Sequence, residues 1–176
     1  MKARLFSLFP AFFLLFFIGC GYTTKSNLSG SLRTVYVDSF ENKVDFTSDG
    51  NRNIYLPLLE VKLRNEVISR YQFDGNLRVG PEAEADLVLK GSLKNYEREG
   101  LRYTDNDDVE EYLVRVTADL ELKDNRNGNV LWTETNFAGE KSYFVTGVKA
   151  TSEETAISGA ITDLARRIVE RTIENW

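Results

Sequence analysis

The sequence predicts an α+β fold, a two-layer sandwich with two helices packed on one face of a mainly antiparallel sheet. Residues 54–71 and 151–176 repeat apolar side chains every three or four positions, as helices with one buried side do. Between them, residues 85–98 and 110–123 alternate apolar and polar side chains, which is typical of strands with one buried face. The helices would therefore cover one face of the sheet and leave the other in water.

The first strand is expected over 34–40, where valine and aromatic residues imply one buried face. The polar residues 41–53 separate it from the first helix. That helix is expected to begin near Ile54 or later, because Pro57 is tolerated only in a first turn. Its apolar stripe is formed by Leu56, Leu59, Leu63, Val67 and Tyr71.

Residues 77–79 are a candidate short strand, and a long strand is predicted over 85–98. In the long strand the leucines at odd positions should face the core. Strict alternation then places Lys90, Lys94 and Arg98 together on the opposite face.

The next strand, 110–123, puts its apolar side chains at even positions and its charged ones at odd positions. Asn127-Gly128 lies between it and the segment 130–144, which is a strong hairpin signal. The connection from the first strand through the first helix is compatible with one parallel strand pair and a right-handed crossover.

The last helix opens after Thr151, whose spacing to Glu154 fits a capping box. Asp163 and Arg167 are spaced for an i,i+4 ion pair on its exposed side. The pattern continues almost to Trp176, so residues 34–176 are expected to form one domain.

The first 19 residues have the organisation of a secretory signal peptide. Lys2 and Arg4 precede an apolar run from Leu5 to Ile18, and the run ends at a glycine. A membrane-spanning helix needs roughly 20 apolar residues, so this run is short for a permanent span.

Cys20 follows directly, and Phe17-Ile18-Gly19-Cys20 resembles a bacterial lipobox, although Phe17 stands where Leu is usual. We therefore expect a lipidated Cys20 and a flexible tether over 20–33. An unpaired cysteine is unexpected in an oxidising export compartment, which favours lipidation over an idle thiol. By analogy with lipoproteins, Gly21 favours sorting to the outer membrane.

Composition excludes several classes of function. The chain has 176 residues, no His and one Cys. This excludes His-dependent nucleophile systems, haem and zinc sites that need His, and Cys-cluster zinc sites. Its formal net charge is −5, and removal of Lys2 and Arg4 makes the remainder more acidic. Binding to nucleic acid through phosphate neutralisation is therefore not expected.

Two acidic groups are weak candidates for sites. Asp105, Asp107 and Asp108 lack the glycine and the distal glutamate of a calcium loop, so a solvated hairpin tip is favoured. Paired carboxylates for a glycosidase would have to come from a surface hairpin without an evident cleft. The residues concerned are Glu97, Glu99, Glu110 and Glu111.

The basic line of Lys90, Lys94 and Arg98 is open to two interpretations. It could meet the phosphates of an anionic ligand. Alternatively, these cations pair across strands with Asp119 and Glu121, at about 0.2–1 kcal/mol per pair. Spacing alone favours the cross-strand pairing.

Taken in order, several short segments resemble the LptE family of lipopolysaccharide-assembly lipoproteins. They are Cys20-Gly21-Tyr22, Phe40-Glu41-Asn42, the stretch from Ala85 to Gly91, Glu111-Tyr112, the stretch from Asn127 to Trp132, Ala156-Ile157 and Ile168-Val169. The resemblance implies a four-stranded sheet carrying two helices, on the periplasmic side of the outer membrane, without catalysis or cofactor.

The resemblance also implies two partners. One is the β-barrel LptD, whose lumen the lipoprotein plugs and whose assembly it assists, and the other is lipopolysaccharide. The cations nearest to a family ligand site are Lys90, Lys94, Arg98, Arg102 and Lys141. A polar sheet face suits a polar barrel lumen. The alternatives are another periplasmic interaction module, either a cell-wall enzyme activator or a pilot protein, and a carboxylate hydrolase.

Overall fold

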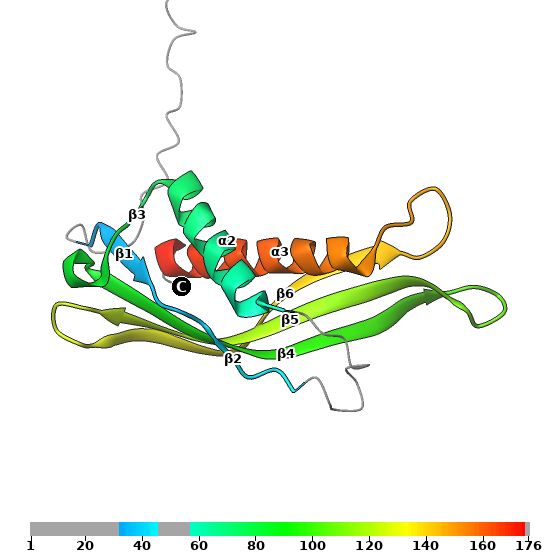
Figure 1. Ribbon diagram of the computed structural model, residues 1–176, viewed down its shortest axis with the longest axis horizontal. Coiled ribbons are helices and arrows are strands. Elements are labelled where there is room, and N and C mark those ends of the chain that lie inside the picture. Colours follow the sequence, from blue (N-terminus) through cyan, green and yellow to red (C-terminus); the bar gives the residue numbers. More distant parts are fainter. Residues whose placement is uncertain (1–31, 46–56, 175–176) are drawn as a thin grey trace, which may run out of the picture.

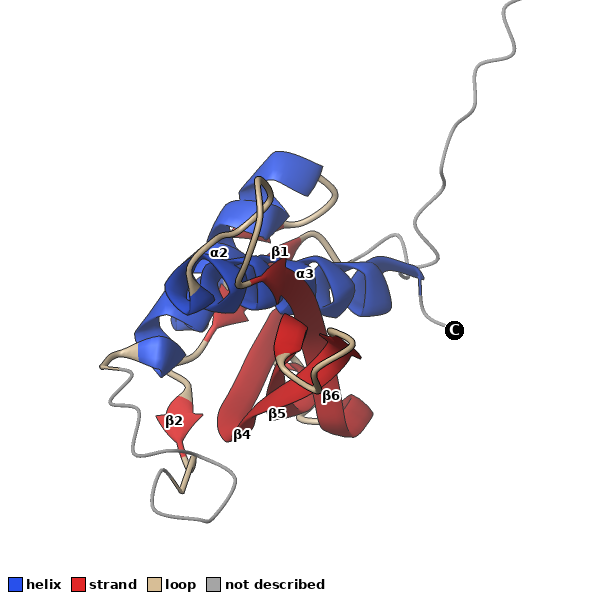
Figure 2. Cartoon of the chain, turned by 90° about the vertical axis from the view of Figure 1, so that its right-hand side faces the viewer, coloured by secondary structure: helices blue, strands red, loops and turns tan. Residues whose placement is uncertain are grey.

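The structure is a computed structural model that describes residues 32–45 and 57–174. The expected signal peptide, Cys20 and most of the tether lie outside the described residues. Figure 1 shows two helices on one side of a long twisted sheet, and Figure 2 shows the same two layers from the end. The predicted α+β two-layer sandwich is confirmed.

The sheet combines parallel and antiparallel pairs. Its order is β3-β1-β4-β5-β6, with β2 beside β4; β1 is parallel to β3 and β4, whereas β4, β5 and β6 are antiparallel. Four strands are longer, as expected, and β2 and β3 add two residues each. The bounds are β1 Thr34–Val37, β2 Glu41–Asn42, β3 Arg78–Val79, β4 Leu87–Tyr103, β5 Val109–Asp124 and β6 Val130–Phe144.

Helix α2 (Leu59–Asp74) begins two residues after Pro57, with Leu58 as its N-cap, consistent with the limit that this proline sets. Its last turn is closed by Gly75, whose φ of 77° lets its N–H donate to the Tyr71 carbonyl. A short 3₁₀ turn, η2 (Glu82–Glu84), leads into β4.

Helix α3 (Glu153–Glu174) is capped one residue later than predicted. The Ser152 hydroxyl accepts the N–H of Thr155 at 3.2 Å, which is the N-cap to N3 bond. The capping box of Thr151 and Glu154 is therefore wrong, because Glu154 lies inside the first turn. Glu153 instead turns its carboxylate toward β4 and β6.

The two helices and the sheet enclose one core. Leu63 and Val67 of α2, Leu89 and Val116 of the sheet, and Leu164 of α3 are fully buried in it. Helix α3 lies so close to β6 that a Cβ on Gly139 would stand 2.3 Å from the Ala160 carbonyl oxygen. Within the described ranges, neither helix offers an apolar stretch long enough to cross a bilayer.

The alternation of β4 changes at a β-bulge between Leu93 and Asn95. Leu89 and Leu93 face the core as predicted. After the bulge, the buried side chain is that of Tyr96, at an even-numbered position. An extra residue in one strand shifts every following side chain to the other face. Arg98 therefore lies on the helix side, opposite Val114 in the register.

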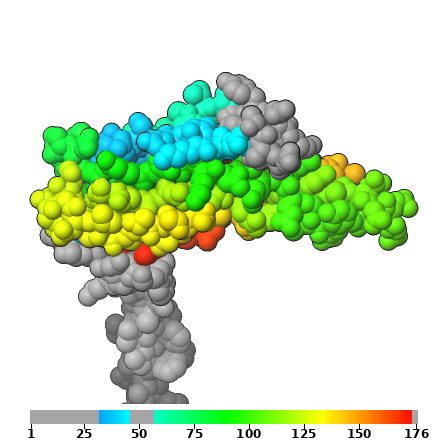
Figure 3. Space-filling view, turned by 90° about the horizontal axis from the view of Figure 1, so that it is seen from below, coloured from blue at the N-terminus to red at the C-terminus, as the bar shows by residue number. Residues whose placement is uncertain are grey.

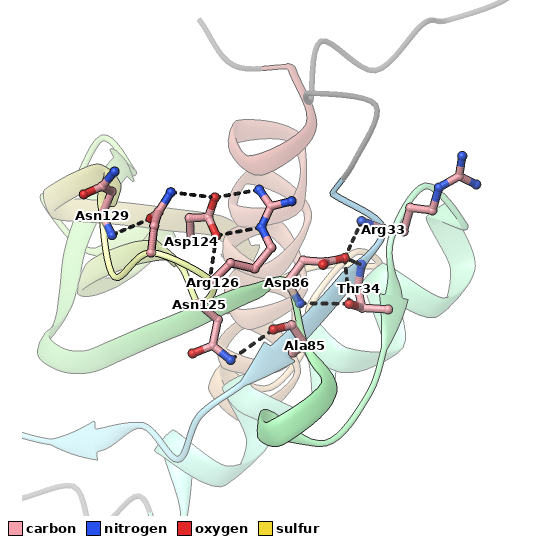
Figure 4. A network of polar contacts seen from close by, with 9 residues as sticks. Arg33, Thr34, Ala85, Asp86, Asp124, Asn125, Arg126 and Asn129 are labelled. Carbon is pink, nitrogen blue, oxygen red and sulfur yellow. Dashed lines mark hydrogen bonds and ion pairs between the residues drawn. The ribbon is translucent and has the colours of Figure 1, made fainter.

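A polar junction fixes the start of the domain, as Figure 4 shows. One oxygen of Asp86 accepts the backbone N–H groups of Arg33 and Thr34 at 2.8 and 3.0 Å and the Thr34 hydroxyl at 2.9 Å. The Asn125 side-chain amide donates to the Ala85 carbonyl at 3.0 Å. These bonds tie β1, the start of β4 and the β5–β6 turn together.

The β5–β6 turn is built around Asp124, which holds Arg126 at 2.7 Å and leads to Gly128, where φ is 76°. The hydrogen bonds from the Arg126 guanidinium lower the pKa of Asp124 from its ordinary 3.8 to about 2. The predicted Asn127-Gly128 hairpin is confirmed, and its role is structural.

Candidate functional site

The face of the sheet away from the helices is open and charged; we call it the open face. Figure 3 looks onto it and shows β4, β5 and β6 side by side, with β2 along their border. Its cations have carboxylate neighbours. The pairs are Lys90–Asp38 at 3.9 Å, Lys94–Asp119 at 3.4 Å, Arg115–Glu140 at 2.6 Å, Arg115–Glu97 at 3.4 Å and Lys123–Glu121 at 2.9 Å.

Lys90 and Lys94 are therefore held in ion pairs rather than presented as free charges. The predicted partner of Lys94, Asp119, is confirmed. Glu121 lies opposite Lys90 in the register but pairs with Lys123, whereas Lys90 reaches Asp38 beyond β1. An anion at this face would meet as many carboxylates as cations.

The prediction that Arg98 shares this face is wrong, because the bulge in β4 turns it to the helix side. There its guanidinium donates to Glu153 of α3 at 2.9 Å and lies 3.9 Å from the centre of the Tyr112 ring. Tyr96 and Tyr143 donate to the same carboxylate at 2.5 and 3.2 Å. We call these five residues the Glu153 cluster.

The Glu153 cluster joins β4, β5 and β6 to the first turn of α3. Partial burial lowers the pKa of Arg98. The hydrogen bond to Tyr143 and the charge of Glu153 outweigh this effect and leave the pKa of Arg98 above its ordinary value. Burial, reinforced by the hydrogen bond to Glu153, raises the pKa of Tyr96. A charge pair held this way stabilises packing and leaves Arg98 committed to Glu153.

The other two predicted cations, Arg102 and Lys141, also lie apart from Lys90 and Lys94. Arg102 lies 3.6 Å from Glu111 and 5.5 Å from the centre of the Phe144 ring. Lys141 lies on the helix side, in the same sheet row as Arg98, and its stem packs beside Gly159 of α3. Among the described residues, Lys141 is exposed and forms no ion pair.

The acidic residues in the described part of the chain do not assemble into a metal site. Within the described ranges, no group of three or more carboxylates is arranged to hold a metal ion. Asp107 lies in the β4–β5 turn with a φ of 62°, and its N–H donates to the Thr104 carbonyl. Glu97 and Glu111 are each bound to an arginine.

Comparison with protein families decides the identity. The LptE lipopolysaccharide-assembly family matches residues 32–172, which covers the whole described domain except its last two residues.

The chain belongs to the LptE family. Membership confirms the predicted resemblance and implies a non-catalytic role in lipopolysaccharide assembly. No curated protein matches the chain.

Solved structures with the same fold have little sequence in common with this LptE-family chain. Protein CT253 from Chlamydia trachomatis is 13% identical with a TM-score of 0.54, covering 80% of this chain and 95% of its own. Protein XCC0632 from Xanthomonas campestris is 11% identical with a TM-score of 0.52, covering 82% and 88%. They are similar in fold alone.

Two features of the candidate site have at most a weak sequence signal. No Gly or Pro lies at the bulge between Leu93 and Asn95 of β4, so simple alternation misplaces Arg98. The open face also has a hollow, with Lys94, Thr117 and Asn136 among its lining residues, where bulges in β4 and β6 flank β5. The positive φ of Asn136 is the local sign of the bulge in β6. An asparagine between strand residues is a weak signal for such a bulge.

Proposed function

We propose that this chain is a lipid-anchored outer-membrane lipoprotein that plugs the LptD β-barrel, assists its assembly and takes part in lipopolysaccharide transport to the cell surface. The observation that carries the proposal is the family match over residues 32–172. The lipobox-like segment before Cys20 supports the anchor. Residues 20–33 would reach at most about 46–50 Å if fully extended.

The open face supports the role of a plug. A barrel lumen is polar, so a plug must be hydrophilic outside while folding around its own core. The open face meets this requirement with paired charges, and the apolar residues lie on its other side under α2 and α3. A domain of this kind can present a polar sheet face to the wall of a lumen.

For lipopolysaccharide, the five predicted cations are not equivalent. Lys90 and Lys94 face carboxylates, and Arg98 is committed to Glu153. Lys141, with Arg102 as a secondary contact, is the cation best placed to meet an anionic glycolipid. We therefore centre the proposed ligand contact on Lys141.

Isolation of the lipoprotein from cross-linked envelopes tests the plug role. A large β-barrel should be recovered with it in mild detergent at normal expression, and depletion should reduce lipopolysaccharide at the cell surface. Recovery of a cell-wall enzyme or another complex in place of a barrel would overturn the proposal and favour the alternative interaction module.

Charge reversal tests the ligand contact. Lys141→Glu should weaken lipopolysaccharide binding by about tenfold, and Lys94→Glu should leave it nearly unchanged. Equal effects of the two variants would contradict the assignment to Lys141.

A further inference from the structure

The open face is hollowed at its centre, where both neighbours of β5 bulge. The register shifts in β4 between Leu93 and Asn95, and the β5–β6 register shifts between Ala118 and Leu120. Bulges bend the strands that carry them. A hollow of about 540 Å³ lies there, lined by Lys94, Asn95, Glu97, Arg115, Thr117, Asn136 and Ala138.

The floor of this central hollow is neutral and has unused hydrogen-bonding capacity. Thr117 is only 8% exposed, and its hydroxyl has no hydrogen-bond partner in the part of the chain that the structure describes. The Asn136 side-chain amide likewise has no partner among the described residues; its backbone N–H donates to Asp119 at 2.9 Å. The hydroxyl is not among the buried side-chain atoms that lack a partner, so it is open to the hollow and can bond to a group that enters.

The rim of the central hollow is charged, but its charges are compensated. Arg115 donates to Glu140 and is paired with Glu97. The hydrogen bond to Glu140 and the charges of both carboxylates raise the pKa of Arg115, although burial acts in the opposite direction. Lys94 is bound by Asp119. A phosphate entering here would displace one of these carboxylates or approach it closely, so an anion is disfavoured and a neutral polar group is favoured.

A neutral polar occupant could be a sugar or a protein loop. Sugar rings commonly bind against aromatic faces, and no aromatic side chain is among the residues that line the central hollow. The mixture of amide, hydroxyl and paired charges instead matches the amide and hydroxyl groups of a polypeptide loop.

We propose that the central hollow seats a short, uncharged polar loop of the barrel that this domain plugs, with Thr117 at the point of contact. This inference rests on the proposed function and adds which surface meets the barrel and what chemistry it meets. The loop would supply hydrogen-bonding groups to Thr117 and Asn136, and the ion pairs on the rim would exclude charged segments.

The test fills the central hollow and measures barrel recovery from membranes of cells that carry the full-length lipoprotein. Thr117→Trp places an indole in the hollow, and Lys123→Trp places the same group on the same face of the same strand, outside it. Thr117→Trp should lower recovery by about tenfold, a cost of about 1.4 kcal/mol. Lys123→Trp should leave recovery close to that of the parent.

Other outcomes are equally informative. Unchanged recovery with Thr117→Trp, or equal loss with both variants, would overturn the inference. If Thr117→Trp does not fold, Thr117→Val decides, because it removes the hydroxyl at nearly constant volume and should still reduce recovery. Shifts of the Thr117 amide resonance on adding lipid-free core oligosaccharide would assign the hollow to a glycan instead.

A photo-reactive residue at Ala138, on the rim of the central hollow, identifies the loop directly. Cross-links should map to one contiguous barrel peptide lacking Lys, Arg, Asp and Glu; a charged peptide would contradict the inference. If the parent lipoprotein recovers no barrel at all, the proposed function fails, and that result is distinct from a failure of the hollow.

Discussion

Asp163 of α3 accepts the backbone N–H of Glu140 of β6 through its carboxylate at 3.1 Å. Four residues on, the Arg167 guanidinium donates to the Ala138 carbonyl of the same strand. The ion pair predicted between Asp163 and Arg167 is not formed. Both side chains bind the backbone of β6, and Asp163 pairs with Arg166. Helix α3 thus occupies backbone groups on the free edge of an edge strand, where they could otherwise pair with another chain.

Removal of this edge cap should promote self-association. Asp163→Ala leaves the Glu140 N–H without its partner, which should cost about 1 kcal/mol of unfolding free energy and produce dimers or larger species. Asp163→Asn keeps an acceptor oxygen and should behave like the parent. Light scattering measures the self-association and urea denaturation measures the loss of stability. If Asp163→Asn behaves like Asp163→Ala, the effect comes from loss of the Asp163 charge beside Arg166 and not from loss of the hydrogen bond to Glu140.

The contact between Gly139 and α3 predicts a severe effect of one methyl group. Gly139→Ala would place Cβ 2.3 Å from the Ala160 carbonyl oxygen and 2.4 Å from the Leu164 nitrogen, both backbone atoms. Separating the helix from the sheet should cost about 1–3 kcal/mol in denaturant unfolding. Gly80→Ala, where nothing lies within 4 Å, serves as the control. A small effect at Gly139 would show that α3 can shift without loss.

The Glu153 cluster predicts a structural role for Arg98. Arg98→Ala leaves the Glu153 carboxylate without its guanidinium partner and should lower stability by about 1–3 kcal/mol. Lys141→Ala, in the same sheet row but exposed, should have little effect on stability. Thermal unfolding compares the two variants. A stable Arg98→Ala domain with impaired glycolipid binding would instead return Arg98 to the ligand site.

Asp124 predicts a loss of stability in acid. Its pKa is about 2 in the fold against an ordinary 3.8, so its contribution is complete above the higher value and disappears as pH falls through the lower one. Unfolding of the parent should therefore show a decrease in stability between these two values. Asp124→Asn should be less stable at neutral pH and show a flatter profile, and an unchanged profile would contradict the assignment.

The proposed lipidation of Cys20 can be tested by substitution. Cys20→Ala should abolish incorporation of labelled palmitate and move the domain out of the membrane fraction. Gly21→Asp should retain the label while changing the membrane in which the lipoprotein is found. Palmitate incorporation by the Cys20→Ala variant would exclude this residue as the site of attachment.

Periodicity was sufficient to predict the helices, the long strands and the hairpin, because each depends on local patterns of apolar residues. The site was less accessible, since it depends on where the strands bulge. Lys94 and Arg98 differ by four residues, and strict alternation places them together, but the extra residue at the bulge between Leu93 and Asn95 puts them on opposite faces. The carboxylate partners that neutralise Lys90 and Arg115 come from other strands or from beyond β1, and local spacing does not reveal them.

The junction at Asp86 determines how the domain would bear a mechanical load. Any pull on the segment before Arg33 enters the fold at β1, which runs parallel to neighbours on both sides. Tension along β1 would be shared by its hydrogen bonds to β3 and β4 and by the bonds to Asp86. These hydrogen bonds would therefore have to break together, and not one after another. A load applied at this end would therefore meet several bonds acting together, which would suit a tethered protein if the proposed anchor at Cys20 holds the domain.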